Sequence, residues 1–116
     1  MIKTTTQDGY PISIPTAFNR YKIIQNIGCG STCSVFLVED IMIKKYFSAK
    51  VISKIDAEKR KIVKSIENEV NILQKIGHPN IVKIEDFFEI KNKFEEEYYV
   101  IIMEYCENGD LLTFID

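Results

Sequence analysis

The chain has 116 residues, of which 46% are hydrophobic and 28% are charged. This is the length of one domain or part of one, and the composition excludes disorder as the general state. Fifteen Lys and Arg against seventeen Asp and Glu give a net charge of −2, so no basic excess is present to drive binding to nucleic-acid phosphates.

The N-terminal half is predicted to contain three strands. Residues 1–20 are polar and include two prolines, so we expect an irregular lead-in there. Residues 21–27 and 35–39 are rich in β-formers and flank a glycine-containing turn, which predicts two strands joined by that turn. A third β-rich segment covers residues 46–53 and carries Lys50 in its middle.

A helix is predicted after this third strand, because the hydrophobic period changes there from two to about 3.6. Asp56 can cap the N-terminus of this helix. Gly77 and Pro79 are expected to end the helix after Ile76, since glycine favours the position just past a helix and proline prevents its continuation.

The rest of the chain is predicted to add a β-hairpin. Residues 81–90 and 98–103 are rich in β-formers, and the charged stretch 91–97 between them is typical of a solvated loop. A polar connector then leads to an apolar segment at 109–116 that begins a further helix. The predicted order is β-β-β-α-β-β and the start of a helix, which indicates an α+β fold.

Neither a membrane segment nor a metal site is indicated. The longest apolar run, residues 98–103, is much shorter than the roughly 20 residues of a spanning helix, and the N-terminus lacks the apolar core of a signal peptide. The cysteines and the single histidine are too few and too scattered for a zinc site or a disulfide framework. They are Cys29, Cys33, Cys106 and His78. We expect free thiols, no bound metal, no membrane contact and a cytoplasmic or nuclear location.

Gly28 and Gly30 lie in the turn between the first two strands. Alone they indicate a ligand site only weakly, because many hairpin turns use glycine simply for its positive φ. A dinucleotide-binding fingerprint would have to open a helix, whereas a strand follows here, and the Gly-Lys-Ser/Thr of a Walker loop is absent. Two interpretations stay open: an ordinary turn, or a glycine-rich hairpin whose N–H groups lie over phosphates.

Glu69 falls within the apolar stripe of the predicted helix. The stripe consists of Ile62, Ile66, Leu73 and Ile76. A carboxylate facing the core costs several kcal/mol unless it has a partner, and Lys50 on the third strand is the obvious cation. The alternative places Glu69 at a partly exposed helix edge and Lys50 on the solvent face.

With these residues in view, the sequence resembles the N-terminal lobe of protein kinases over residues 21–116. Five segments carry the resemblance in the family's order: 27–35 (IGCGSTCSV, glycine-rich loop), 48–50 (SAK, lysine strand), 69–73 (EVNIL, αC helix), 78–82 (HPNIV, exit of that helix) and 103–111 (MEYCENGDL, hinge). Gly28 precedes Lys50 by 22 residues and Lys50 precedes Glu69 by 19, as in the family. The resemblance implies a five-stranded antiparallel sheet with one αC helix, and a partial kinase domain that ends after the hinge.

The resemblance also implies the roles of individual residues. Lys50 would hold the α- and β-phosphates of ATP, and Glu69 would pair with Lys50. The other implied nucleotide contacts are Gly28 and Gly30 in the glycine-rich loop, Ile27, Val35 and Ser48 over the adenine, Met103 as gatekeeper, the backbone of Glu104 and Cys106 at the adenine edge, and Asp110 at the ribose. For Met103, packing in the core is an equally simple explanation.

The chain departs from the family pattern at two residues and lacks the motifs that supply the catalytic base and the metal ligands. Cys33 replaces the third glycine and Ser48 the usual alanine; both are small, so the pocket should survive. No His-Arg-Asp or Asp-Phe-Gly motif occurs in these residues, so the catalytic base and the Mg²⁺ ligands would belong to an absent C-terminal lobe. We therefore expect a truncated chain, inactive by itself.

Two functions remain open. The first is the ATP-binding lobe of a serine/threonine kinase that resembles calmodulin-dependent and related kinases and meets its protein substrate through the absent lobe. The second is a stand-alone, non-catalytic kinase-like binding module. In-frame His-Arg-Asp and Asp-Phe-Gly motifs in the coding DNA beyond residue 116 would favour the enzyme.

Overall fold

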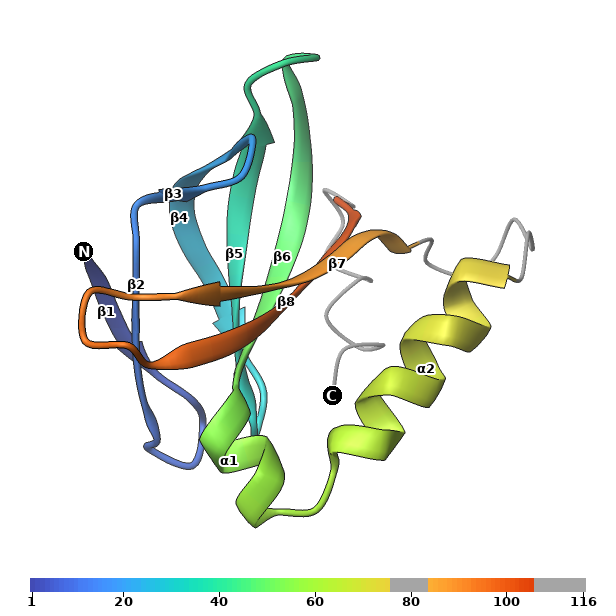
Figure 1. Cartoon of the computed structure of the whole chain (residues 1–116). Coiled ribbons are helices and arrows are strands. Elements are labelled where there is room, and N and C mark those ends of the chain that lie inside the picture. The colour runs from blue at the N-terminus through green and yellow to red at the C-terminus, as the bar shows by residue number, and fades with distance from the viewer. Residues whose placement is uncertain (76–83, 106–116) are drawn as a thin grey trace.

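The computed structural model describes residues 1–75 and 84–105, apart from the side chains of Glu69 and residues 72–75. Its strands are β1 (Ile2–Thr5), β2 (Pro11–Ile14), β3 (Ala17–Phe18), β4 (Tyr21–Cys29), β5 (Cys33–Asp40), β6 (Lys45–Ser53), β7 (Ile84–Lys91) and β8 (Glu97–Glu104), and its helices are α1 (Lys54–Lys59) and α2 (Val63–Lys75). Figure 1 shows these elements in the molecule. Within the described ranges, no helix is both long and apolar enough to cross a membrane.

One antiparallel sheet organises the lobe. Its strand order is β3-β4-β5-β6-β8-β7, and β1 and β2 form a separate two-stranded hairpin. The strands expected from the sequence are all found, and most extend by one to three residues beyond the predicted bounds. The α+β fold is confirmed, with six strands in the main sheet rather than five because the short β3 pairs with β4.

Hydrophobic side chains cover both faces of the sheet. Along β6, Phe47, Ala49 and Val51 belong to one buried cluster, whereas Ile52 belongs to the other. This alternation follows from the two-residue period of a strand. We call the first side the hairpin face, because β1 and β2 pack on it, and the second the helix face, because α2 packs on it. Both sides of the sheet therefore have a core of their own.

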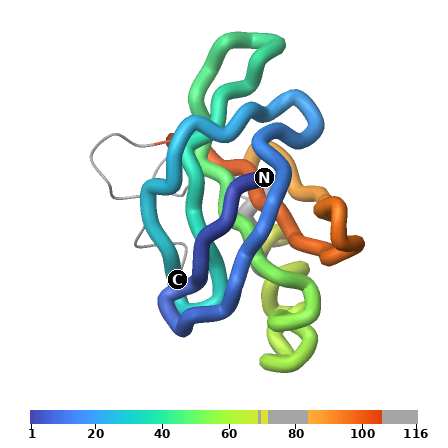
Figure 2. The backbone as a smooth tube through the Cα atoms, turned by 90° about the vertical axis from the view of Figure 1, so that its left-hand side faces the viewer, coloured from blue at the N-terminus to red at the C-terminus, as the bar shows by residue number. Residues whose placement is uncertain are grey.

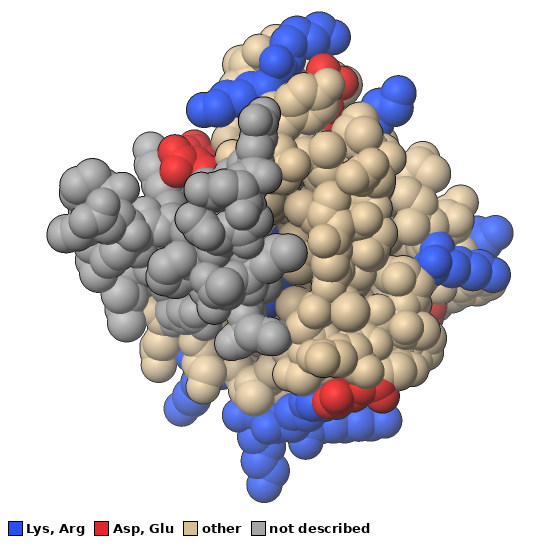
Figure 3. All heavy atoms as spheres, turned by 180° about the vertical axis from the view of Figure 1, so that it is seen from behind, with Lys and Arg blue, Asp and Glu red and all other residues tan. Residues whose placement is uncertain are grey.

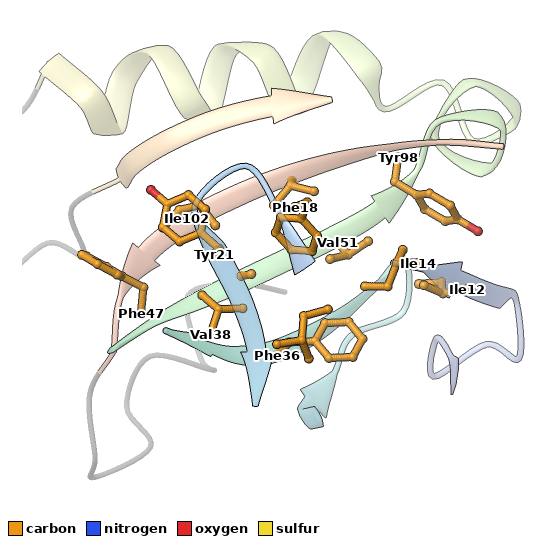
Figure 4. Close-up of a cluster of buried hydrophobic side chains, with 13 residues drawn as sticks. Ile12, Ile14, Phe18, Tyr21, Phe36, Val38, Phe47, Val51, Tyr98 and Ile102 are labelled. Carbon is orange, nitrogen blue, oxygen red and sulfur yellow. The ribbon is translucent and has the colours of Figure 1, made fainter. Parts of the chain in front are cut away.

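The hairpin face disproves the expected irregular lead-in at residues 1–20. Ile12 and Ile14 of β2 are fully buried in its cluster, which Figure 4 shows in close-up. The Ser13 N–H donates to the Tyr98 hydroxyl oxygen at 3.0 Å. Pro11 is typical of irregular structure, but here it is the first residue of an edge strand, a position at which the missing N–H of proline is tolerated. The alternation of Pro11 to Ile14 was the valid strand signal.

The predicted single helix over residues 56–76 is divided in two. Ser53, not Asp56, caps α1, since its hydroxyl accepts from the Asp56 N–H at 3.3 Å. The helix then ends in a Schellman motif at Lys61, whose φ is 58°. Lysine occupies the left-handed position where glycine is usual, so no sequence signal marked this end. Ile76, Gly77 and Pro79 lie outside the described residues.

Helix α2 covers the helix face through its apolar stripe. Ile66 and Val70 are buried there, and Ile62 packs against the same cluster from just before the helix. The amphipathic pattern therefore predicted correctly which side of this helix meets the sheet. The Leu73 side chain and Ile76 lie outside the described residues.

Candidate functional site

The helix face brings together four of the predicted site residues. In the strand register, Val35 of β5 lies opposite Lys50 of β6, and Ser48 of β6 lies opposite Met103 of β8. Val35 and Met103 belong to the buried cluster of this face. Ser48 and Lys50 point to the same side, because they alternate with the hairpin-face residues of β6. The three central strands thus align these side chains.

The glycine-rich turn (residues 28–33) joins β4 to β5 at one end of this face. Gly28 pairs with Val35, and the Gly30 N–H donates to the Cys33 carbonyl at 3.1 Å. Among the glycines of the described ranges, only Gly9 has a positive φ. The backbone at Gly28 and Gly30 therefore does not require glycine for its conformation. This favours the interpretation in which missing side chains let a ligand approach the backbone.

A side-chain hydrogen bond stiffens the base of this turn. The Asn26 Nδ2 donates to the Ser34 Oγ at 2.7 Å, across the strand pair next to a register shift at Asn26 and Gly28. Ser34 is fully buried. The bond links the exposed Asn26 to the buried Ser34, and it ties β4 to β5 at the base of the turn.

Lys50 lies half-buried in the middle of β6, between Val35 and Ile101 of the neighbouring strands. Glu69 lies in α2, one residue before the buried Val70 and three after the buried Ile66. The helix backbone therefore runs over the face that carries Lys50. The Glu69 side chain is outside the described part of the structure, so its pairing with Lys50 stays a prediction.

Ser48 is the chemically unusual member of the group. Its side chain is fully buried, yet its hydroxyl oxygen has no hydrogen-bond partner among the residues that the structure describes. Leu37 and Met103 lie opposite it on the two adjacent strands. Such orphaned hydroxyls are rare in protein interiors, because a buried polar group without a partner costs about 1–3 kcal/mol. The Ser48 hydroxyl could therefore hydrogen-bond to a ligand at the predicted nucleotide site.

The remaining predicted contacts lie at the edges of the face or outside it. Ile27 is half-buried and packs against the helix-face cluster. Met103 is buried in that cluster, so its packing role is shown and its gatekeeper role stays a prediction. Glu104 is exposed at the end of β8, and Cys106 and Asp110 lie outside the described residues.

Two groups of contacts escaped the sequence analysis. The Gln7 N–H donates to the Gly30 carbonyl at 2.9 Å, which ties the N-terminal hairpin to the glycine-rich turn. Lys54 contacts Glu89 at 2.6 Å and Glu97 at 3.2 Å, and these hydrogen bonds raise the pKa of Lys54. Neither group of contacts has a local sequence signal. Almost any residue at position 7 would supply the same backbone N–H, and the partners of Lys54 lie far from it along the chain.

Two observations bear on metals and thiols. Within residues 1–75 and 84–105, no three His, Cys, Asp or Glu side chains are grouped so that they could hold a metal ion. Cys29 is exposed and Cys33 is buried, and neither forms a disulfide with a described residue. The face described above therefore offers backbone N–H groups, one lysine and one hydroxyl to a ligand.

An antiparallel sheet with a glycine-rich turn, a central lysine and a helix packed on the same face is the architecture of the nucleotide-binding lobe of kinases. A family model described as the protein kinase domain matches residues 21–116, and the chain therefore belongs to the protein kinase family.

Known kinases are similar to the chain. It is 36% identical over 105 residues to calcium-dependent protein kinase 6 of Plasmodium berghei and 33% identical over 92 residues to calcium/calmodulin-dependent protein kinase type II of Schizosaccharomyces pombe. These matches cover 90% and 79% of this chain. A third match, to the serine/threonine-protein kinase cds1 of Schizosaccharomyces pombe, is 26% identical over 114 residues and covers 95% of the chain. The chain spans only 6%, 17% and 24% of the lengths of these three relatives, in that order.

Proposed function

We propose that this chain is the ATP-binding lobe of a protein serine/threonine kinase. In the complete enzyme it would hold ATP while the γ-phosphoryl group is transferred to a serine or threonine of a protein substrate. The observation that carries this proposal is the strand register that sets Lys50 beside Val35, next to the glycine-rich turn and on the face covered by α2. Similarity to serine/threonine kinases supports the residue class of the acceptor.

Different polar groups of the helix face would bind different parts of the triphosphate. Backbone N–H groups of the glycine-rich turn, other than that of Gly30, which donates to the Cys33 carbonyl, suit phosphate oxygens, because no side chain at Gly28 or Gly30 blocks a close approach. Lys50 supplies a positive charge for the α- and β-phosphates, and Glu69 would hold the Lys50 ammonium in place. ATP, when bound, supplies the phosphoryl group; the residues of this lobe position it.

The apolar groups of the face would cover the base. Ile27, Val35 and Met103 provide a hydrophobic roof over a purine, and Ser48 adds a hydroxyl to it. The backbone at Glu104 and Cys106 would meet the polar edge of the adenine, and Asp110 the ribose. These assignments follow the family pattern residue by residue.

Mg²⁺, the catalytic base and the protein substrate would be held by a C-terminal lobe. We assign no metal ligand within this chain. On the face shown in Figure 3, most of the visible Lys and Arg side chains lie at the rim. The net charge of −2 supports a partner other than a nucleic acid. We further propose a cytoplasmic or nuclear location without membrane contact, and the absence of a disulfide at Cys29 and Cys33 among the described residues supports a reducing compartment.

Replacing Lys50 tests this function. In the protein that contains both lobes, Lys50→Met should lower the rate of phosphoryl transfer roughly 100-fold or more, because the developing charge on the phosphates loses its positive neighbour. The protein should stay folded, since Lys50 is only half-buried, but its melting temperature should fall because Glu69 would lose its partner. Lys45→Met, at the exposed start of the same strand, is the matched control and should keep full activity.

Unchanged transfer in Lys50→Met would exclude this role of Lys50. The alternative function, a non-catalytic kinase-like binding module, would be favoured if wild-type protein bound ATP but the coding DNA contained no in-frame His-Arg-Asp or Asp-Phe-Gly motif.

A further inference from the structure

We propose that the N-terminal hairpin β1–β2 is a brace that positions the glycine-rich turn, and that Gln7 is its positioning residue. Figure 2 shows the hairpin turn, in dark blue, beside the turn between β4 and β5. The inference rests on the proposed function in one respect: the braced turn is the one assigned to the phosphates. Four sets of contacts support it.

The contact itself is a main-chain hydrogen bond. The Gln7 N–H donates to the Gly30 carbonyl at 2.9 Å, while the Gly30 N–H donates to the Cys33 carbonyl at 3.1 Å. Gly30 is therefore held on one side by its own turn and on the other by the hairpin. Because Gly30 is buried, water cannot easily replace the Gln7 donor. Lifting the turn away from the sheet would break this bond.

The donor is carried by a rigid turn. The Gly9 N–H donates to the Thr6 carbonyl at 2.9 Å, and the Thr6 N–H donates to the Tyr10 carbonyl at 2.9 Å. The Thr6 hydroxyl also accepts from the Tyr10 N–H at 3.1 Å, and Thr6 is buried. Gln7 is the second residue of this β-turn, so the three hydrogen bonds among Thr6, Gly9 and Tyr10 fix the direction of its N–H.

The hairpin is anchored to the sheet independently of this contact. Ile12 and Ile14 are fully buried on the hairpin face. The Ser13 carbonyl accepts from the Asn92 Nδ2 at 2.8 Å, and the Ser13 N–H donates to Tyr98. Because β2 is fixed to the sheet by these contacts, the hairpin can hold the glycine-rich turn in place.

A second arm of the brace reaches the helices. The Asp8 carboxylate contacts the Arg60 guanidinium at 3.0 Å, and Arg60 contacts the buried Asp56 of α1 at 3.2 Å. The hydrogen bonds to Asp8 and Asp56 raise the pKa of Arg60. An exposed ion pair of this kind contributes little energy alone. It connects the hairpin turn to the corner that leads into α2, the helix of Glu69.

Two substitutions at Gln7 separate the main-chain donor from the side chain. Gln7→Pro removes the N–H, and proline suits the second position of a β-turn, so the turn itself should persist. Gln7→Ala keeps the N–H and is the matched control. In the full-length protein we expect Gln7→Pro to speed amide hydrogen exchange in residues 28–34 and to raise the KM for ATP, each by roughly fivefold. The value of kcat should change much less, and Gln7→Ala should match wild type.

The outcomes distinguish this inference from the proposed function. Unchanged exchange in residues 28–34 of Gln7→Pro would overturn the brace, whatever Lys50→Met does to activity. Faster exchange with an unchanged KM for ATP would overturn its role in nucleotide binding. If Gln7→Pro does not fold, the wild-type Gln7 amide decides: strong protection from exchange supports the brace, and exchange at the rate of an unstructured peptide refutes it.

Discussion

Ser34 and Ser48 are both fully buried, but their hydroxyl groups differ in one respect. Ser34 accepts a hydrogen bond from Asn26 at 2.7 Å, whereas the Ser48 oxygen has no partner among the described residues. The residues lie on the adjacent strands β5 and β6 but on opposite faces, since Ser34 pairs with Val51 of the hairpin face and Ser48 lies on the helix face. Ser48 thus lowers stability at a position where a small apolar residue would fit, and the proposed nucleotide site is the reason we assign to it.

This difference predicts opposite effects of the same substitution. Ser48→Ala should raise the free energy of unfolding by about 1 kcal/mol, because it removes a buried hydroxyl that has no partner among the described residues. Ser34→Ala should lower it by about 1 kcal/mol, because the Asn26 amide loses its acceptor. Denaturant unfolding of both variants measures the two changes. A loss of stability in Ser48→Ala would show that its hydroxyl is satisfied.

The resemblance to the kinase lobe predicted that Val35, Ser48, Lys50 and Met103 belong to one site, whereas the residues alone left the face of Lys50 open. The strand register aligns the four residues on one face, and their roles toward ATP stay predictions. The contact from Gln7 to Gly30 could not be predicted, since it depends on how two turns meet in space. The orphaned oxygen of Ser48 is also a property of packing, not of sequence.

At the scale of elements, the errors have two physical causes. The hairpin β1–β2 was not predicted because Pro11 and Pro15 are typical of irregular segments. The alternation that buries Ile12 and Ile14 indicates a strand there. The break between α1 and α2 was missed because Lys61 takes a left-handed conformation that normally favours glycine.

Strands β4 and β8 carry the tyrosines that make the sheet sensitive to alkali. Burial raises the pKa of Tyr21, Tyr98 and Tyr99, and for Tyr21 the nearby Asp86 raises it further. A group whose pKa is higher in the folded state holds its proton more tightly there. Its stabilising contribution is therefore complete below the unfolded pKa of about 10 and is lost as the pH rises through the folded pKa.

We accordingly expect the free energy of unfolding to fall as the pH rises above about 10. Denaturant unfolding followed across the alkaline range measures this slope. Tyr99→Phe removes one of the three groups and should make the fall shallower. A stability that stays constant through the alkaline range would contradict the burial of these hydroxyl groups.

The whole molecule is a sheet with two unlike sides. The hairpin face is closed by residues of β1 and β2, which tie it to the glycine-rich turn through Gln7. The helix face carries the polar groups assigned to ATP and is covered by α2. The chain belongs to the protein kinase family, and its helix face carries Lys50. We therefore propose that the phosphates of ATP lie against Lys50.

An acyl phosphate derivative of ATP tests this claim most directly, because it transfers its acyl group to an amine beside the bound phosphates and releases ATP. Peptide mapping of the labelled full-length protein should find Lys50 acylated, and excess ATP should strongly suppress that labelling. Labelling of the exposed Lys22 and Lys45 should not respond to ATP. Absence of label on Lys50, or labelling of Lys50 that ATP does not suppress, would contradict the proposed site.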